Sequence, residues 1–273
     1  MMTVIVIVLI FLGLFLFMIA PSGAKVDDSA LRGWLYAHRG LHDGNVNVPE
    51  NSMEAFRLAV EKGYGMELDV QLTRDGKLVV HHDGSLLRVC GVDQKILDTD
   101  YARLPLLPDG SRIPLLSEVL SMVDGRAPII VEVKYYGGAA KVAKAAHEVL
   151  KDYRGAYCVE SFDPSAMAYF RKNAPGIVRG QLASGGKRDK AAVNLVSYIA
   201  LKYLLVNVLS RPHFVAYSVP EDHTVSMWMM KRVFRPLLAC WTVREQQTLD
   251  YARKEGYLYP IFELFVPQKG RKG

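Results

Sequence analysis

The chain has 273 residues, of which 50% are apolar and 23% are charged, and its formal net charge is +6. This composition excludes a disordered chain, a collagen and a disulfide-stapled miniprotein, and it is too polar for a polytopic membrane protein. The lysines and arginines are scattered among acidic residues without a basic stripe, so nucleic-acid binding is not indicated. Cys90, Cys158 and Cys240 form no CxxC pair, which argues against a zinc or redox motif.

The N-terminal segment contains no charged side chain over residues 1–20. As a helix it would be about 30 Å long, close to the hydrocarbon thickness of a bilayer. We expect a transmembrane helix that anchors the chain to the cell membrane by a single pass, followed by a linker over residues 21–30. A cleaved signal peptide is the alternative, because residues 22–24 resemble a small-residue cleavage site, but the usual basic n-region is missing.

The charges beside this segment predict its orientation. Lys25, Arg32 and Arg39 follow the apolar residues, whereas only the α-amine precedes them. The positive-inside rule therefore places the catalytic part in the cytoplasm. Asp27 and Asp28 on the same flank reduce the difference in charge.

Beyond the linker, short β-branched runs alternate with helical patterns, which is typical of βα units around a parallel sheet in an α/β fold. No linker interrupts this alternation, so we predict one soluble domain. Nine strands are expected, one more than an eight-stranded barrel needs, and the pattern does not identify the additional one. The expected strands are Trp34–His38, Tyr64–Leu72, Leu78–His82, Pro128–Lys134, Ala156–Phe162, Ile177–Leu182, Phe214–Ser218, Leu237–Val243 and Leu258–Leu264.

The connections between these strands are of two kinds. Only five residues separate Leu72 from Leu78, and they contain the turn signal Asp75-Gly76, so we expect a tight turn without a crossover helix. Most other connections contain a helical pattern. Four of these patterns follow residues typical of helix starts, namely Asn51-Ser52, Ser117, Asp163-Pro164 and Thr242.

Residues 191–209 form an apolar stretch that departs from this alternation, and Lys187, Arg188 and Lys190 precede it. We expect a long amphipathic helix that covers the barrel. One alternative is an interfacial helix on the membrane that holds the anchor. The other alternative is a second transmembrane span, although it would have to form between two strands of one barrel.

Two carboxylates occur at alternate positions of an expected strand. Glu67 and Asp69 point to the same face, about 7 Å apart along the chain, because side chains two apart on a strand share a face. Two like charges held together destabilise a fold unless a cation neutralises them. Oxygen ligands suit a hard ion, Mg²⁺ or Ca²⁺. Two solvated acids on an exposed edge strand are the alternative interpretation.

A second charged pair lies on the apolar strand that begins near residue 128. Glu132 and Lys134 share one face of a strand that is otherwise typical of complete burial. Burying an unpaired ion costs several kcal/mol, so both groups need partners. One alternative is a salt bridge to a neighbouring strand. The other is that Glu132 is a third carboxylate ligand of the metal and that the Lys134 ammonium binds an anionic substrate.

Histidines close two of the expected strands. His38 and His82 lie at strand ends, and the C-terminal strand ends of a βα barrel form its site-bearing face. Imidazoles titrate near neutral pH and therefore suit general acid and base roles. A lone histidine at a strand end is more often structural. The joint occurrence with the two acidic motifs favours the catalytic interpretation.

Motifs in a fixed order extend over roughly residues 34–265. They are His38-Arg39-Gly40, Pro49-Glu50-Asn51-Ser52, the run from Glu67 to Thr73 with Asp75-Gly76, Val79-Val80-His81-His82-Asp83, Glu132-Val133-Lys134, Glu160-Ser161-Phe162-Asp163 and Cys240-Trp241-Thr242-Val243. Together they resemble the motifs of the glycerophosphodiester phosphodiesterase family.

The resemblance implies a TIM-type (β/α)8 barrel over residues 31–267, followed by a basic tail over residues 268–273. It implies metal-dependent hydrolysis of glycerophosphodiesters, which are deacylated phospholipids, to sn-glycerol phosphate and an alcohol, with Mg²⁺ or Ca²⁺ as cofactor. By motif position, it implies that His38 and His82 are the general acid and base and that Glu67, Asp69 and Glu132 bind the metal. It implies that Arg39 and Lys134 bind the phosphate. Glu50 would lie near the metal or the glycerol hydroxyls, and Trp241 would form an apolar wall of the substrate pocket.

Two positions depart from the family pattern. His81 precedes His82, and we choose His82 because the family histidine directly precedes the aspartate that is Asp83 here. Near the C-terminus the family usually has Ile-Thr-Asp, whereas this chain has Ile261-Phe262-Glu263. Glu263 either replaces that aspartate or marks the loss of a substrate contact.

Two other functions stay open. A related phosphodiesterase acting on an intact lipid, of the lysophospholipase D or phosphatidylinositol phospholipase C kind, would suit the anchor and the apolar stretch. The second of these is a catalytically inactive, membrane-tethered binding module, although the intact histidines and acids count against it. The sequence does not indicate the alcohol of the substrate, the acid and base assignment or the oligomeric state.

Overall fold

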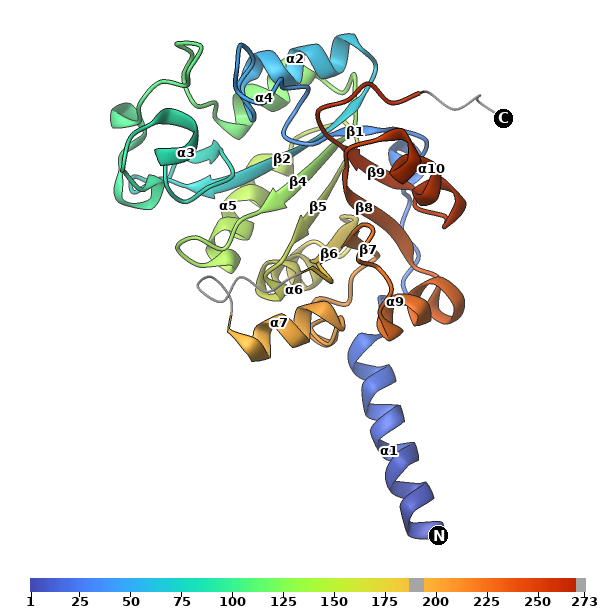
Figure 1. The fold of residues 1–273 in the computed structure, drawn as a ribbon. Helices are drawn as coiled ribbons and strands as arrows, with labels where there is room; N and C mark the ends of the chain where they lie inside the picture. The colour runs from blue at the N-terminus through green and yellow to red at the C-terminus, as the bar shows by residue number, and fades with distance from the viewer. Residues whose placement is uncertain (187–193, 269–273) are drawn as a thin grey trace.

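The computed structural model describes residues 1–186 and 194–268, so most of the expected basic tail and residues 191–193 lie outside the described part. Eight parallel strands close into a barrel in the order β1-β2-β4-β5-β6-β7-β8-β9, because β1 pairs with both β2 and β9 (Figure 1). The prediction of a TIM-type barrel is therefore confirmed. The barrel strands are β1 Tyr36–Ala37, β2 Gly65–Leu72, β4 Ile129–Val133, β5 Tyr157–Ser161, β6 Arg179–Ala183, β7 Phe214–Ser218, β8 Leu237–Val243 and β9 Tyr259–Phe262.

The additional strand is β3, Leu78–Val80, which pairs antiparallel with the outer end of β2. Val80 lies opposite Val70, so the hairpin brings the chain back toward the barrel mouth. The expected tight turn is confirmed, since the Thr73 backbone N–H donates to Lys77 O and Gly76 takes a positive φ of 77°. The histidine pair after β3 thus reaches the mouth through a hairpin and not at the end of a barrel strand.

Helices connect the barrel strands and cover the outside of the barrel (Figure 1). Residues 81–115, between β3 and α4, form an insertion with short helical turns at Leu87–Cys90 (α3), Ile96–Asp98 and Tyr101–Arg103. The remaining helices are α1 Met2–Ile19, α2 Met53–Glu61, α4 Leu116–Val123, α5 Ala139–Leu150, α6 Pro164–Asn173, α7 Leu195–Lys202, α8 Asn207–Ser210, α9 Val225–Met229 and α10 Gln246–Lys254, with a 3₁₀ turn at Ser29–Leu31 and a π-helical turn at Met230–Phe234.

Two of the expected helix starts are confirmed by their caps. Ser52 Oγ accepts from the Ala55 N–H at the start of α2, and an Asp163 carboxylate oxygen accepts from the Ser165 N–H at the start of α6. The pattern placed at Ser117 begins one residue earlier. The start expected at Thr242 is wrong: Thr242 lies within β8, and α10 begins four residues later.

The alternation of side chains along the strands separates two apolar layers. On β2, Met66, Leu68 and Val70 face outward and pack with the covering helices in the main core. A second cluster fills the inside of the barrel, where Phe214 and Tyr259 meet edge to face with ring centroids 5.6 Å apart. This inner cluster forms an apolar floor beneath the mouth, as expected for the layered interior of such barrels.

The expectation of one long helix over residues 191–209 is wrong. The described part of this stretch contains two short helices, α7 and α8, separated by a turn. Leu204 in that turn is fully buried in the core with a φ of 58°, a left-handed conformation that ends the helix. Burial of Leu204 thus stabilises the turn between α7 and α8.

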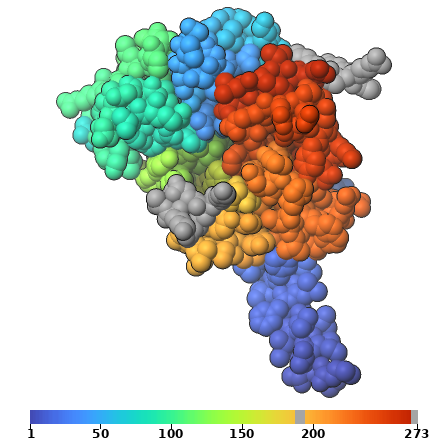
Figure 2. All heavy atoms as spheres, in the orientation of Figure 1, coloured from blue at the N-terminus to red at the C-terminus, as the bar shows by residue number. Residues whose placement is uncertain are grey.

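Helix α1 projects from the barrel as a separate stalk (Figures 1 and 2). In the described part of the chain it is the one helix long and apolar enough to cross a membrane, and most of its surface is exposed. Its C-terminal end is held by the barrel: Ile19 is fully buried, Asn207 Nδ2 donates to Ile19 O at 2.8 Å, and Arg211 Nη1 donates to Phe17 O at 2.8 Å. The helix end is therefore part of the folded body.

A buried histidine at the N-terminal side of β7 predicts a pH dependence of stability. Arg179 Nη1 lies 3.1 Å from His213 Nε2, which accepts from the guanidinium and carries no proton. Burial, and then the charge of Arg179, lowers the pKa of His213 to about 4. Because the unfolded histidine titrates near 6.5, the unfolded state binds more protons between pH 6.5 and 4, and we expect the free energy of unfolding to fall by about 3 kcal/mol as pH falls through that window.

Urea unfolding of the full-length chain in detergent micelles, followed by circular dichroism at several pH values, measures this dependence. The control is His213→Gln, whose amide oxygen can accept from Arg179 but does not titrate. We expect the variant to lose less stability than the wild type between pH 6.5 and 4. Parallel curves for the two proteins would contradict the assignment.

Candidate active site

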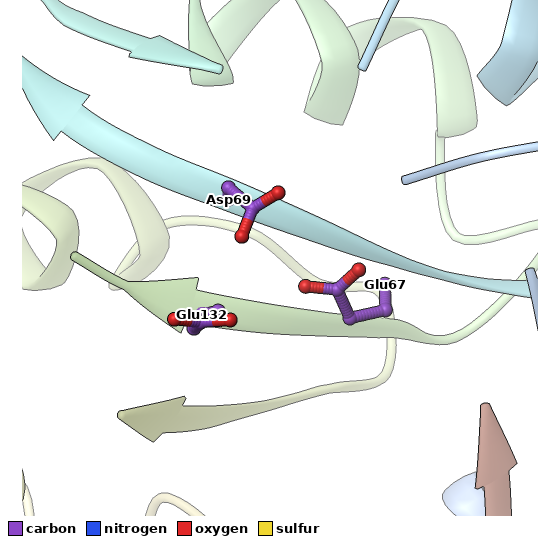
Figure 3. A group of neighbouring side chains, drawn as sticks. All are labelled: Glu67, Asp69 and Glu132. Atoms are coloured by element: carbon purple, nitrogen blue, oxygen red, sulfur yellow. The ribbon is translucent and has the colours of Figure 1, made fainter. Parts of the chain in front are cut away.

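The three sequence-predicted metal ligands meet inside the barrel mouth (Figure 3). Glu67 and Asp69 come from β2 and Glu132 from β4, where Asp69 and Glu132 are direct register partners. One carboxylate oxygen from each residue lies within 4.8 Å of the others, and all three side chains are buried. The structure therefore brings together the three acids that the sequence predicted to share a site.

A fourth carboxylate continues the same row. Glu160 on β5 is the register partner of Glu132, is 1% exposed, and has no hydrogen-bond partner at Oε2. Glu160 lies in the Glu160-Ser161-Phe162-Asp163 motif and was not among the predicted site residues. Its signal was the same as for the other acids, a charged residue in an otherwise apolar strand.

Burial over the apolar floor sets the electrostatics of these acids. Ile130 and Cys158 lie two residues before Glu132 and Glu160 on the same inner faces, so apolar side chains replace water below the carboxylates. Burial, followed by the charges of the neighbouring acids, raises the pKa of Glu67 well above its ordinary value. This environment thus favours the neutral form of Glu67 unless a cation lies beside it.

Lys134 partly compensates for this charge. Its Nζ lies 2.7 Å from Asp69 Oδ1 and 2.6 Å from Glu132 Oε1. Although burial opposes the charged form, these two carboxylates raise the pKa of Lys134 above its ordinary value. The ammonium is therefore charged and faces the acids, and its contact with Asp69 on β2 is the salt bridge to a neighbouring strand that was one of the two alternatives for this charged pair.

Arg39 joins the acids from the loop after β1. Its backbone N–H donates to Glu67 Oε2 at 3.0 Å, and its Nε lies 3.5 Å from Asp69 Oδ2. Its Nη1 donates to Glu50 Oε1 at 2.8 Å. The guanidinium thus lies at the mouth beside the acids, where the sequence placed a phosphate-binding group.

Glu50 belongs to a neighbouring ion pair and not to the carboxylate cluster. Arg88 donates to both of its oxygens at 2.7 Å, in addition to the bond from Arg39. Although burial favours the neutral acid, the two arginines lower the pKa of Glu50 to about 2. Arginines thus bond to both carboxylate oxygens of Glu50, and this contact fixes the position of the Arg39 guanidinium. Arg88, from α3 of the insertion, was not among the predicted site residues.

His38 is held by a carboxylate from the opposite end of the chain. Its Nδ1 lies 2.7 Å from Glu263 Oε1, and its Nε2 lies 3.9 Å from Glu67 Oε2. Burial lowers the pKa of His38, while the bond to Glu263 opposes this effect. An imidazole that donates from Nδ1 to Glu263 presents its free Nε2 to the acid cluster. Glu263, at the position where the family motif has aspartate, therefore orients His38.

His82 is likewise held through its Nδ1 by a carboxylate. Its Nδ1 lies 2.5 Å from Asp83 Oδ1, and Asp83 Oδ2 accepts from Arg88 Nε at 2.6 Å. His82 is partly exposed, whereas the neighbouring His81 is buried with its Nδ1 on Asp83 O. The accessible member of the pair is the one that the sequence analysis chose.

Two further residues complete the site. Asn51 Nδ2 donates to Asp69 Oδ2 at 2.8 Å and so fixes that carboxylate, a contact that the sequence analysis did not predict. Trp241 on β8 is partly buried and meets Phe162 edge to face with ring centroids 5.5 Å apart. Both rings pack against the inner cluster.

The buried acids fit a divalent cation. Glu67 Oε1 and Glu160 Oε2 are buried and have no hydrogen-bond partner, and one ammonium and one guanidinium face four carboxyl groups. Buried carboxylates normally have partners, and a divalent cation bound between these acids would supply partners for the unpaired oxygens. An all-oxygen ligand set favours a hard ion over a transition metal.

A cavity of about 680 Å³ adjoins the His82 side of the mouth. It lies between the insertion and the loop after β4, and Leu87, Leu97 and Tyr136 supply apolar surface to it. Asp83 and Arg88 line the same cavity, so it communicates with the ion pairs beside His82.

The sequence profile of the glycerophosphoryl diester phosphodiesterase family matches residues 38–257 of this chain. A glycerophosphodiester phosphodiesterase of Bacillus altitudinis is 35% identical over 52% of this chain and 63% of that protein. A human lysophospholipase D is 34% identical over 43% of this chain and 40% of that protein. The chain spans slightly less than two thirds of the length of the bacterial relatives that it matches first.

Solved structures share this fold. A glycerophosphodiester phosphodiesterase from Thermotoga maritima has a TM-score of 0.64 at 28% identity, with 84% of this chain and 93% of that chain covered. A phosphodiesterase from Oleispira antarctica, solved with the product sn-glycerol-3-phosphate, has a TM-score of 0.69 at 21% identity, with 86% and 94% covered.

Proposed function

Because the chain belongs to the glycerophosphoryl diester phosphodiesterase family, we propose that it hydrolyses glycerophosphodiesters to sn-glycerol phosphate and an alcohol. The observation that carries the proposal is the convergence of three buried carboxylates, a lysine, an arginine and two oriented histidines at one barrel mouth. The relatives named as phosphodiesterases, and the product found in the Oleispira antarctica enzyme, support the same substrate class.

Glu67, Asp69 and Glu132 would hold the cation, and we propose Mg²⁺ or Ca²⁺ because all the ligands are oxygens. The bound ion supplies charge stabilisation to the phosphoryl oxygens. Arg39 and Lys134 add positive charge from the protein on the same side of the mouth.

The two histidines divide the proton transfers. The glycerol 2-hydroxyl attacks phosphorus, one imidazole takes its proton, and the other imidazole gives a proton to the alkoxide that leaves. Water then opens the cyclic phosphate with the proton transfers reversed. Glu263 and Asp83 each hold an Nδ1 atom, which leaves both Nε2 atoms for these transfers.

Hydrolysis of glycerophosphocholine by the purified full-length chain tests this proposal. We expect equal amounts of choline and sn-glycerol phosphate with added Mg²⁺ or Ca²⁺, and a rate lower by about 10²-fold or more with EDTA. His82→Ala is expected to lower kcat by about 10²- to 10⁴-fold, the usual contribution of a general acid or base. A folded wild type that hydrolyses neither this diester nor a lysolipid would favour the binding-module interpretation.

A lysolipid is the second candidate substrate. The cavity beside His82 has apolar walls at Leu87, Leu97 and Tyr136, which suits part of an acyl chain better than a small polar alcohol. Human, mouse and rat relatives are named lysophospholipase D. Choline release from lysophosphatidylcholine, compared with glycerophosphocholine under the same conditions, distinguishes the two substrates.

We also propose that α1 is a retained anchor with the barrel on the cytoplasmic side. Cleavage after residue 24 would remove Ile19 from the core and leave the fully buried Asn207 without the carbonyl that accepts from its Nδ2. Two of the flanking cations are neutralised locally, because Arg32 pairs with Asp28 and Arg39 lies in the site. Arg211, whose Nη1 donates to carbonyls at the end of α1, supplies positive charge at that end.

A further inference from the structure

Two crossover segments carry large apolar side chains on their exposed faces. On α7, Leu195 is 55% exposed and Val196 is 78% exposed. On α9 and the π-helical turn that follows it, Val225, Trp228 and Val233 are each more than half exposed. Soluble domains rarely leave such apolar helix faces in water without a partner.

These segments surround the point where α1 leaves the barrel. Helix α8 packs on the end of α1, and Asn207 of α8 bonds to Ile19 O. Ser226 of α9 donates to the carbonyl oxygen of Tyr203, the residue directly after α7, at 2.6 Å. Helices α7, α8 and α9 are therefore neighbours on this surface. Figures 1 and 2 show α7 and α9 at the edge of the barrel from which α1 projects. A bilayer spanned by α1 would end at this edge, since 18 helical residues rise about 27 Å.

The same surface is cationic. Between residues 195 and 237 the chain has five lysines and arginines and only two acids. One of those acids, Asp222, is buried against Lys231 at 2.7 Å, and Glu255 of α10 pairs with the same lysine at 2.8 Å, so Lys231 adds no net charge to this surface. Arg232 and Arg235 are exposed beside Val233. Exposed apolar side chains flanked by cations are the composition of segments that lie in the interface of an anionic membrane.

We propose that residues 195–235 form a membrane-lying face, which rests the side of the barrel on an anionic bilayer beside the anchor. Leu195, Val196, Val225 and Trp228 enter the interface, and Arg232 and Arg235 bind lipid phosphates. The inference rests on the proposed anchor and adds a second, broad contact to it. It also accounts for the part of the apolar stretch that does not cover the barrel: α7 has no buried residue, and Leu195, Val196 and Ile199 on it are exposed.

Tryptophan quenching by brominated lipids tests this face with the full-length chain in vesicles. The chain has three tryptophans, and Trp228 is the exposed one, whereas Trp34 and Trp241 are partly buried. Flotation of the vesicles first measures membrane association. In phosphatidylcholine–phosphatidylglycerol vesicles we expect brominated lipid to quench the wild type and Trp228→Phe to lose the bromine-sensitive fluorescence.

A charge-neutralised variant tests the lipid specificity. R232Q/R235Q is expected to lower the quenching in anionic vesicles to the level seen in pure phosphatidylcholine. The matched control is R103Q/R154Q, which removes two exposed arginines elsewhere on the barrel and leaves the quenching unchanged. Flotation without quenching of Trp228 would overturn the face and leave the anchor standing. Failure to float would overturn both, and turnover of glycerophosphocholine in the same sample reports separately on the proposed reaction.

Discussion

Glu67→Gln is expected to abolish the effect of divalent cations on both activity and stability while the barrel stays folded. Glutamine keeps an oxygen for the Arg39 N–H, so the local hydrogen bond survives and only a charged ligand is lost. We expect kcat/KM for glycerophosphocholine to fall by about 10²- to 10³-fold or more, the cost of losing one group that stabilises developing charge. Thermal unfolding of the wild type should shift upward with added cation, since a ligand at 100 times its Kd stabilises the native state by about 2.7 kcal/mol.

The control for this prediction is Glu148→Gln, which removes a carboxylate from the exposed side of α5. It should retain both the activity and the cation-induced rise in Tm. EDTA should reduce wild-type activity to the level of Glu67→Gln, and added Mg²⁺ or Ca²⁺ should restore it only in the wild type. A Glu67→Gln chain that keeps the cation-induced rise in Tm would place the metal elsewhere.

The carboxylate cluster could be predicted because it depends on local rules. The alternation of β2 puts Glu67 and Asp69 on one face, and neighbouring parallel strands place Glu132 level with Asp69. The charged residues in these strands stand out because the flanking positions are apolar and buried. The same rule applies to Glu160, whose position beside Glu132 could have been predicted from the sequence by following the row one strand further.

Contacts between distant segments could not be predicted in this way. The pairing of His38 with Glu263 spans 225 residues and exists only because β9 closes the barrel against β1. The bond between Arg88 and Glu50 depends on how the insertion folds back over the mouth. The break between α7 and α8 occurs at a leucine, which carries no turn signal, because burial of Leu204 outweighs its preference for a right-handed backbone.

The pairing of His38 with Glu263 predicts a non-additive pair of substitutions. His38→Ala is expected to lower kcat by about 10²- to 10⁴-fold. Glu263→Gln removes the carboxylate that fixes the ring and is expected to lower kcat by about 10- to 100-fold, the usual cost of losing an orienting partner. If Glu263 acts only through His38, the double variant is no slower than His38→Ala alone. A merely structural role for Glu263 would instead lower the activity of both backgrounds by the same factor.

Arg244→Gln is the matched control for this cycle. Arg244 pairs with the other oxygen of Glu263 at 2.8 Å, but its side chain is 64% exposed. An exposed ion pair contributes at most about 1 kcal/mol, so kcat should change by no more than about fivefold. Steady-state kinetics of the four proteins in the cycle and of this control separate the two carboxylate contacts. An equal loss in Arg244→Gln and Glu263→Gln would show that the ion pair with Arg244, and not the orientation of His38, is what the carboxylate of Glu263 provides.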